Sequence, residues 1–478
     1  MLPVSRTPRF TTLLAATVLG VYLLVVAGAT TALAEAVTAC TSWPLCSDPL
    51  TDPKVAIATG HRVVAALVGL LGVVTAYVGW SAASRRVKGA LLTAGLLYPV
   101  QVGLGAFVAV TGAPAPLSGA HLLVGTAIFT ALALALAWQL EAETGHRDPV
   151  ADTDEPPVAE DSDTDSHPVP PSPAPTRPTT FAGRAKTTLW AYFQLMKPRL
   201  MWLLCLVASA GMALAAGPAL RLDTIVYTLT GGILAIGASG TFNHVLERDI
   251  DQKMQRTSDR PLATHQVPVR NALTFGGMLT LAAVAIFLQV NLLAAALGFV
   301  AIVFYSVIYT LVLKPNTVQN TVIGGAAGAL PALIGWVAVT GEITGDVAGG
   351  TGLGGLVLAG VIFLWTPAHF YNLALAYKDD YERGGFPMMP VVRGETATRK
   401  HILYYLAATL LAATALTALT GLGPLFAVTT VSLGAVFLWM VVRLHRERTE
   451  AAAFRAFHAS NAYLGALLFA IVVDAIAL

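Results

Sequence analysis

Apolar segments of about 20 residues recur along the chain, and Arg, Lys, Pro or Gly bounds each of them. A helix that crosses a hydrocarbon core of about 30 Å needs an apolar segment of this length. The pattern therefore predicts an all-α integral membrane protein with about 4 + 9 transmembrane helices. The predicted spans lie near residues 10–33, 55–80, 90–111 and 118–140, and then near 200–217, 224–243, 272–289, 293–313, 318–340, 352–372, 401–420, 425–443 and 459–477.

A polar segment separates the two groups of spans. Residues 141–188 contain nine prolines between Pro149 and Pro178, many acidic residues and few large apolar ones, so they cannot bury enough surface to fold. The sequence predicts a first domain over 1–140, a disordered linker over 141–188 and a second domain over 189–478. We expect the linker to tether two separately folded units.

Composition and charge support a membrane location and predict an orientation. With 55% hydrophobic and 12% charged residues, the chain does not fit a soluble protein of 478 residues. Lys and Arg gather in short loops, which indicates cytoplasmic loops rather than binding of nucleic acid. This rule places the charged loops 244–271 and 373–400 and the linker in the cytoplasm. A cleaved signal peptide is an alternative for the first apolar segment, whose length favours a retained helix.

Three cysteines are too few for a disulfide framework. Cys40 and Cys46 flank Trp43 and Pro44 in a loop that the charge pattern places outside the cell. A disulfide between them could persist there.

Acidic and basic side chains cluster in the first charged loop. Asn243, Glu247 and Asp251 are spaced four residues apart, so they share a face if the segment is helical. Their oxygens suit Mg²⁺, and the guanidinium groups of Arg256 and Arg260 suit phosphate. The alternative is a basic loop with solvated acids, which does not explain acids spaced along one face at the end of an apolar span.

The second charged loop begins inside a span. His369, Asn372 and Asp380 lie close to one helical face, and Asp379 adds another carboxylate. Residues 384–394 form a segment rich in turn residues. His369 fits a core histidine and a site residue equally well.

The motif NxxxERDID, followed by RTxxRPL, resembles the first acid-rich motif of the UbiA-type intramembrane prenyltransferases, and in particular that of their haem O synthase branch. Three further segments resemble this branch in order and spacing, over about residues 190–478: KPNTVQNTVIGGAAGALPALIGW, WTPAHFYNLA and DDYERGGFPMMPVVRG. Departures are Glu247 where aspartate is usual, Val318 where proline is common, and Ala376 where the wider superfamily has an acid.

This resemblance implies transfer of a farnesyl group from farnesyl diphosphate to haem B within a UbiA-type helical bundle. It implies Mg²⁺ as cofactor and haem as substrate. The implied metal-site and catalytic residues are Asn243, Glu247, Asp251, Asp379 and Asp380. The implied diphosphate ligands are Lys197, Arg256, Arg260 and Lys314, and His369 is a candidate haem contact.

Two histidines lie at similar depth in the first group of spans. His61 and His121 sit near the outer ends of their helices, as a pair of axial haem ligands would. Together with Glu35, CTSWPLC and QVGLGA, they resemble the N-terminal half of haem A synthase, over about residues 10–140. That family usually has two four-helix halves. Activity here would therefore need a dimer or a separate haem A synthase partner, and otherwise the module would only bind haem.

Two other functions remain open from sequence. A UbiA-type transferase acting on a quinone or lipid would share the acidic residues but not the GGFPMMPVVRG segment. A non-enzymatic haem-binding or transport protein would usually carry ionisable groups in mid-membrane, whereas most of them here lie at one rim.

Overall fold

The computed structural model describes residues 7–33, 36–37, 39–40, 42–112, 114–145, 180–344 and 352–477. Within these residues, thirteen helices are long and apolar enough to cross a membrane, four in the first group and nine in the second. The predicted fold class is therefore confirmed. The centre of the predicted disordered linker lies outside the described residues.

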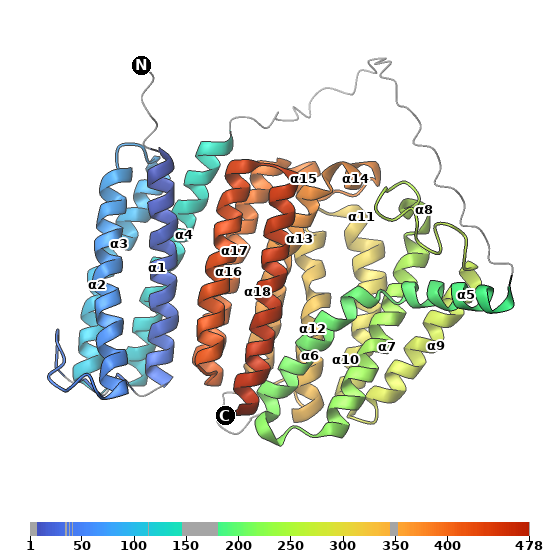
Figure 1. Ribbon diagram of the computed structural model, residues 1–478, viewed down its shortest axis with the longest axis horizontal. Coiled ribbons are helices and arrows are strands. Elements are labelled where there is room, and N and C mark those ends of the chain that lie inside the picture. The colour runs from blue at the N-terminus through green and yellow to red at the C-terminus, as the bar shows by residue number, and fades with distance from the viewer. Residues whose placement is uncertain are drawn as a thin grey trace, which may run out of the picture.

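The first four spans form a bundle of antiparallel helices (Figure 1). They are α1 (Thr7–Leu33), α2 (Pro53–Gly79), α3 (Arg85–Val110) and α4 (Ala115–Thr144). The side chains of Asp52 and Ser84 accept backbone N–H groups and so cap the starts of α2 and α3. α1 packs along α2 and α4, and α3 packs along α4, whereas α2 and α3 touch little.

The second group surrounds the candidate site. Its spans are α6 (Pro198–Ala216), α7 (Leu222–Leu246), α9 (Val269–Phe287), α10 (Leu292–Val303), α12 (Asn320–Thr340), α13 (Gly354–Ala376), α16 (Gly394–Thr420), α17 (Pro424–Glu447) and α18 (Glu450–Ala477). A π-helical segment, η3 (Phe304–Leu313), extends α10 into α11 (Lys314–Asn316). The short helices α8 (Arg248–Asp251), α14 (Lys378–Arg383) and α15 (Met389–Val392) lie together at one end of the bundle (Figure 1).

An additional helix, α5 (Phe181–Leu195), begins inside the region predicted to be disordered, and α4 also extends into that region. α5 runs crosswise to α6 and α7 (Figure 1). Ala191 and Leu195 are buried against the first charged loop, while Trp190 and Phe193 are exposed. This two-sided pattern is typical of a helix that lies in the membrane interface.

The two modules pack directly on each other. α1 and α4 lie against α16 and α17, and one apolar core contains buried residues from all four helices. At one end of this contact Lys400 forms an ion pair with Glu141, and Arg446 donates a 3.0 Å hydrogen bond to Thr12. The expectation of two units joined only by a tether is therefore wrong.

Candidate active site

The three spaced residues of the first charged loop lie on one buried wall. Asn243 ends α7 and Asp251 ends α8, with Glu247 at the junction between these helices. The backbone bonds from Glu247 N to Asn243 O and from Asp251 N to Glu247 O continue the helical ladder across that junction. The side chains consequently share a face, as their spacing predicts, and they are 2%, 5% and 2% exposed.

Each member of this wall has a basic partner from another part of the chain. Lys197 donates to Asn243 Oδ1, and Lys314 Nζ lies 2.5 Å from Glu247 Oε1. Arg260 Nη1 lies 2.8 and 2.9 Å from the two carboxylate oxygens of Asp251. The structure therefore brings three predicted diphosphate ligands together with three predicted metal ligands, and we call these six residues the charged wall.

Lys197 is held in place by an unusual backbone. It precedes α6 with φ 56°, a left-handed conformation that non-glycine residues seldom adopt. Its turn fits closely against α7 because Gly240 has no side chain; a Cβ there would lie 2.8 Å from Leu195 O. Lys197 Nζ also donates to the Tyr305 hydroxyl at 3.2 Å.

Burial and neighbouring charge shift the pKa values of the charged wall. Burial, assisted by the Arg260 charge, lowers the pKa of Lys197 to about 7. Burial raises the pKa of Asp251 despite its ion pair with Arg260. Burial acts in the same direction on Glu247, but Lys314 and Lys197 outweigh it and hold the pKa of Glu247 below its ordinary value. The wall thus combines anionic oxygens with cations that could exchange their partners for phosphate.

An apolar pocket opens beside the charged wall. Lys197 and Tyr305 are at its polar end, and small or apolar residues of the surrounding spans make up most of the remaining lining. These residues come from α6, α7, α9, α10 and α12. Lys197 therefore belongs both to this pocket and to the charged wall.

In the second charged loop, Asp380 contacts the backbone of the first charged loop. Asp380 Oδ1 accepts hydrogen bonds from Gln255 N and Arg383 Nη2, both at 2.8 Å, and its Oδ2 accepts one from Arg256 N at 3.3 Å. Protein donors thus occupy both carboxylate oxygens, and Asp380 fixes the first loop instead of joining the charged wall. Its pKa is low because these hydrogen bonds outweigh the effect of burial.

Asp379 and Arg256 face a second, polar pocket. Asp379 is exposed there, and the guanidinium of Arg256 lies 5.3 and 5.7 Å from the ring centres of Tyr377 and Tyr381. The pocket is also lined by Lys378, Arg383, Arg399 and Arg448. Neither Asp379 nor Arg256 contacts the charged wall in any described interaction, so their predicted roles remain predictions.

The described residues include no group of three or more His, Cys, Asp and Glu side chains arranged to hold a metal ion. Magnesium does not require one, because it usually binds through one or two carboxylates together with substrate phosphates and water. Glu247 and Asp251 on one wall, with the side-chain cations of Lys197, Lys314 and Arg260 beside them, have the chemistry to fit a Mg²⁺-diphosphate unit.

His369 is surrounded by α18 and by its own helix. Its ring stacks between Trp365 and Phe457, with both centroids at 4.3 Å, and Nδ1 lies 2.6 Å from Ser460 Oγ. These contacts fit the core-histidine alternative, and the predicted haem contact remains a prediction.

Sequence reasoning missed the polar side chains of η3. Tyr305 bonds Lys197, and the Thr310 hydroxyl accepts a 3.0 Å hydrogen bond from Asn243 Nδ2. A cluster of Tyr, Ser and Thr in the middle of an apolar span was the available signal, and π-helical segments are frequent at functional sites.

In the front module, His61 and His121 point into the four-helix bundle. His61 lies against Gly28 of α1, and His121 lies against Gly105 of α3 and 3.2 Å from Gln101 Nε2. Within the described part of the chain, Nδ1 of both rings is buried without a hydrogen-bond partner. Glycines facing two imidazoles, each with a buried Nδ1 that has no hydrogen-bond partner, fit a haem. Glu35 lies outside the described residues.

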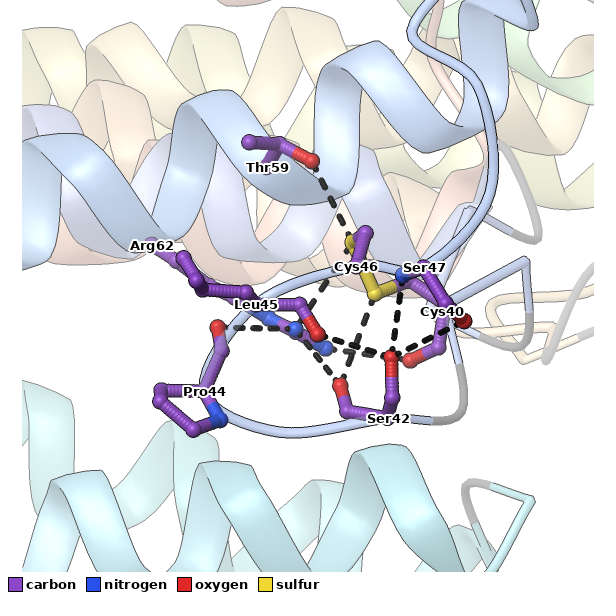
Figure 2. Close-up of a disulfide and its surroundings, with 8 residues drawn as sticks. All are labelled: Cys40, Ser42, Pro44, Leu45, Cys46, Ser47, Thr59 and Arg62. Atoms are coloured by element: carbon purple, nitrogen blue, oxygen red, sulfur yellow. Dashed lines mark hydrogen bonds between the residues drawn. A yellow bond between two sulfur atoms is a disulfide. The ribbon is translucent and has the colours of Figure 1, made fainter.

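Cys40 and Cys46 form a disulfide with their sulfurs 1.98 Å apart (Figure 2). Arg62, which follows His61 in α2, reaches this loop and donates to the carbonyl oxygens of Cys40, Ser42 and Pro44 at 3.0, 2.8 and 3.2 Å (Figure 2). The loop is thereby fastened to the helix that carries the histidine.

Comparison with known proteins identifies the family. A family described as the UbiA prenyltransferase family matches residues 203–467. The chain belongs to the UbiA prenyltransferase family. A second family, described as cytochrome oxidase assembly protein (COX15-CtaA), matches residues 2–133.

Relatives within the UbiA family match the whole chain. A protoheme IX farnesyltransferase of Haloarcula marismortui is 65% identical over 99% of both chains. Protoheme IX farnesyltransferase 1 of Natronomonas pharaonis is 64% identical over 99% of this chain and 100% of its own. The chain is thus a member of the protohaem IX farnesyltransferase group of this family, with a COX15-CtaA module in front.

One solved structure supports the UbiA fold of the second module. A structure of digeranylgeranylglyceryl phosphate synthase covers 61% of this chain and 100% of its own, with TM-score 0.51 and 15% identity. A UbiA homologue from Archaeoglobus fulgidus bound to GPP and Mg²⁺ covers 59% of this chain and 99% of its own, with TM-score 0.45 and 16% identity.

Proposed function

We propose that the chain transfers the farnesyl group of farnesyl diphosphate to a vinyl group of haem B, producing haem O and diphosphate. The observation that carries this proposal is that Lys197 lies where the charged wall meets the apolar pocket. One side chain bonds the charged wall and also lines the apolar pocket. A prenyl diphosphate has the matching form, an anionic head joined to an apolar chain. The name of the full-length relatives supports the choice of both substrates.

The charged wall favours departure of diphosphate. The bond between C1 of farnesyl and its oxygen breaks, and the diphosphate leaves with the electron pair. Lys197, Lys314 and Arg260 stabilise the charge that develops on the phosphate oxygens. Glu247 and Asp251, with help from Asn243, would hold Mg²⁺, which would supply further positive charge to the leaving group.

The apolar pocket protects the resulting allyl cation from water. The π electrons of a haem vinyl group form the new carbon–carbon bond, and the cation left on the porphyrin side chain takes up water and releases a proton. The ring of Tyr305, whose centroid lies 5.4 Å from Lys197 Nζ, lies beside the charged wall, and its π electrons favour a nearby cation.

The orientation of the charged wall follows from the distribution of Lys and Arg. We infer that the end of the bundle with α8, α14 and α15 faces the cytoplasm of a cell-membrane protein. The disulfide loop then faces the outside of the cell, where oxidising conditions preserve a disulfide.

The front module, in the same proposal, binds haem between His61 and His121. The unpartnered Nδ1 atoms of the two rings support this assignment. Oxidation of a haem methyl group would require a second such module, from another copy of the chain or from a separate partner.

The decisive experiment is an assay of the purified full-length chain with haem B, farnesyl diphosphate and Mg²⁺, with haem O detected by mass spectrometry. Glu247→Gln and Asp251→Asn should each reduce turnover by about 100-fold or more, the usual effect of removing one group that stabilises developing charge. Asp249→Asn is the matched control, because Asp249 is exposed and pairs with Arg248.

Two results would contradict the proposal. Prenylation of a quinone or a lipid phosphate, without any prenylation of haem, would assign the chain to the alternative acceptor class. Normal haem O formation by both charged-wall variants would exclude the proposed role of these carboxylates.

A further inference from the structure

The apolar pocket is bordered on one side by closely packed helices. It lies among α6, α7, α10 and α12, and on one side α6 and α12 cross with their backbones in contact. A Cβ on Gly211 would lie 2.4 Å from Ala332 O, and one on Gly335 would lie 2.1 Å from Ala208 O. A prenyl chain therefore cannot pass between these two helices at that depth.

Phe287 lines the pocket at the level of Gly231, about two and a half turns of α7 from Gly240. It is the last residue of α9, is fully buried and lines the pocket. Its ring is wedged between Gly231 of α7 and Gly298 of α10, where an added Cβ would lie 2.9 and 2.5 Å from ring atoms. The two glycines thus leave room for one aromatic ring in the lining of the pocket.

The depth of this ring can be compared with the length of a prenyl chain. Gly240, beside Lys197, and Gly231, beside Phe287, are nine residues apart on α7, or about 14 Å at 1.5 Å per residue. An extended farnesyl main chain of eleven bonds spans about 13 Å if each bond advances about 1.2 Å, as in an extended backbone. A geranylgeranyl chain is about 5 Å longer on the same basis.

We propose that Phe287 sets the length of the prenyl chain that the enzyme accepts, by stopping the pocket at the end of a farnesyl group. This inference rests on the proposed farnesyl transfer. It adds that a longer chain is excluded by one ring and a shorter one leaves apolar space unfilled.

A substitution at Gly232 tests the proposal by shortening the pocket instead of lengthening it. Gly232 lines the pocket one residue from Gly231, and a Cβ built on it would meet no atom within 4 Å. We expect a larger side chain at this position to occupy part of the pocket and so to shorten it, because its Cβ displaces no neighbour.

The experiment gives the full-length chain haem B with geranyl, farnesyl or geranylgeranyl diphosphate and measures kcat/KM for each. Phe287→Ala should raise the ratio of geranylgeranyl to farnesyl transfer at least tenfold, and Gly232→Val should raise the ratio of geranyl to farnesyl transfer at least tenfold. Gly277→Val is the matched control, because Gly277 is another helical glycine with open space around it and does not line the pocket.

The outcomes separate this proposal from the function on which it rests. If the unaltered chain makes no haem O from farnesyl diphosphate, the proposed function fails. If the unaltered chain is active and the variants change these transfer ratios less than twofold, Phe287 does not determine which prenyl chain length is accepted. Because Phe287→Ala leaves a cavity that can destabilise the fold, Phe287→Leu provides a milder enlargement, and Gly232→Val tests the pocket independently of that cavity.

Discussion

The hydroxyl of Tyr22 in α1 lies 2.9 Å from the hydroxyl of Thr430 in α17, although 408 residues separate them in the sequence. Thr430 also lies 3.3 Å from the hydroxyl of Tyr463 in α18. All three side chains are buried, so a polar chain runs through the apolar contact between the two modules. The front module is therefore a fixed neighbour of the transferase module.

Cutting the linker should leave the two modules together. With a protease site inserted between residues 150 and 176, the fragments should still co-elute in mild detergent after complete cleavage, because α1 and α4 pack on α16 and α17. Size-exclusion chromatography of cut and uncut protein measures this.

A change within the contact provides the control. Tyr22→Phe removes one hydroxyl and should weaken the association by about 1 kcal/mol, whereas Tyr22→Ala also opens a cavity and should release the front fragment. Separation of the unaltered fragments on cleavage would show that the packed contact contributes little.

The position of Asp380 leads to a prediction about magnesium. Asp380 accepts hydrogen bonds from the backbone of Gln255 and Arg256. Asp380→Asn should therefore loosen the first charged loop and lower kcat. The Mg²⁺ concentration that gives half-maximal activity should stay within about twofold of its value in the unaltered protein. Glu247→Gln should raise that concentration at least tenfold.

Titration of activity with Mg²⁺ distinguishes these roles. If Asp380→Asn weakens the Mg²⁺ dependence as strongly as Glu247→Gln does, Asp380 is a metal ligand, as the sequence alone suggests.

The sequence predicts those features of the structure that depend on a single repeating pattern of residues. Spans need long apolar segments in any membrane protein, and a spacing of four places Asn243, Glu247 and Asp251 on one face wherever the helix continues. The basic residues beside them were recognisable as phosphate ligands. Their pairing, Lys314 with Glu247 and Arg260 with Asp251, depends on which helices are neighbours, and that is a tertiary property.

Other features cannot be predicted from one sequence. The faces of α1 and α4 that contact the second module are apolar, like the faces that contact lipid, because lipid chains are as apolar as Leu. Tyr22 is a polar residue within that contact, but one tyrosine in an apolar helix does not identify its partner. The contacts of Asp380 are hard to predict for a related reason: a carboxylate that accepts backbone N–H groups looks the same in sequence as one that binds a metal.

Arg62 should stabilise the disulfide loop through its fork of donors. Arg62→Lys keeps the charge but cannot reach three carbonyl oxygens in the same geometry, so local stability of the loop should fall by about 2 kcal/mol. Limited proteolysis within residues 42–50 measures the loss. Arg86→Lys, at the other end of α2 and α3, is the control, and equal cleavage rates for all three proteins would show that Arg62 does not hold the loop.

The last prediction concerns haem in the front module. His61→Ala and His121→Ala should each reduce the haem that co-purifies with the full-length chain, and the double change should abolish the absorption bands of histidine-ligated haem, because each ring offers an unpartnered nitrogen inside the bundle. Farnesyl transfer should continue in all three variants, since the charged wall lies in the other module.

His401→Ala is the matched control: His401 lies in α16, and its Nδ1 is 2.7 Å from the carbonyl oxygen of Ala397 in its own helix. An unchanged haem spectrum in the double variant would exclude these histidines as ligands. If haem is lost and farnesyl transfer falls in proportion, the front module supplies haem to the transferase module. The packed contact around Tyr22 and Thr430 is then the candidate path for haem between the two modules.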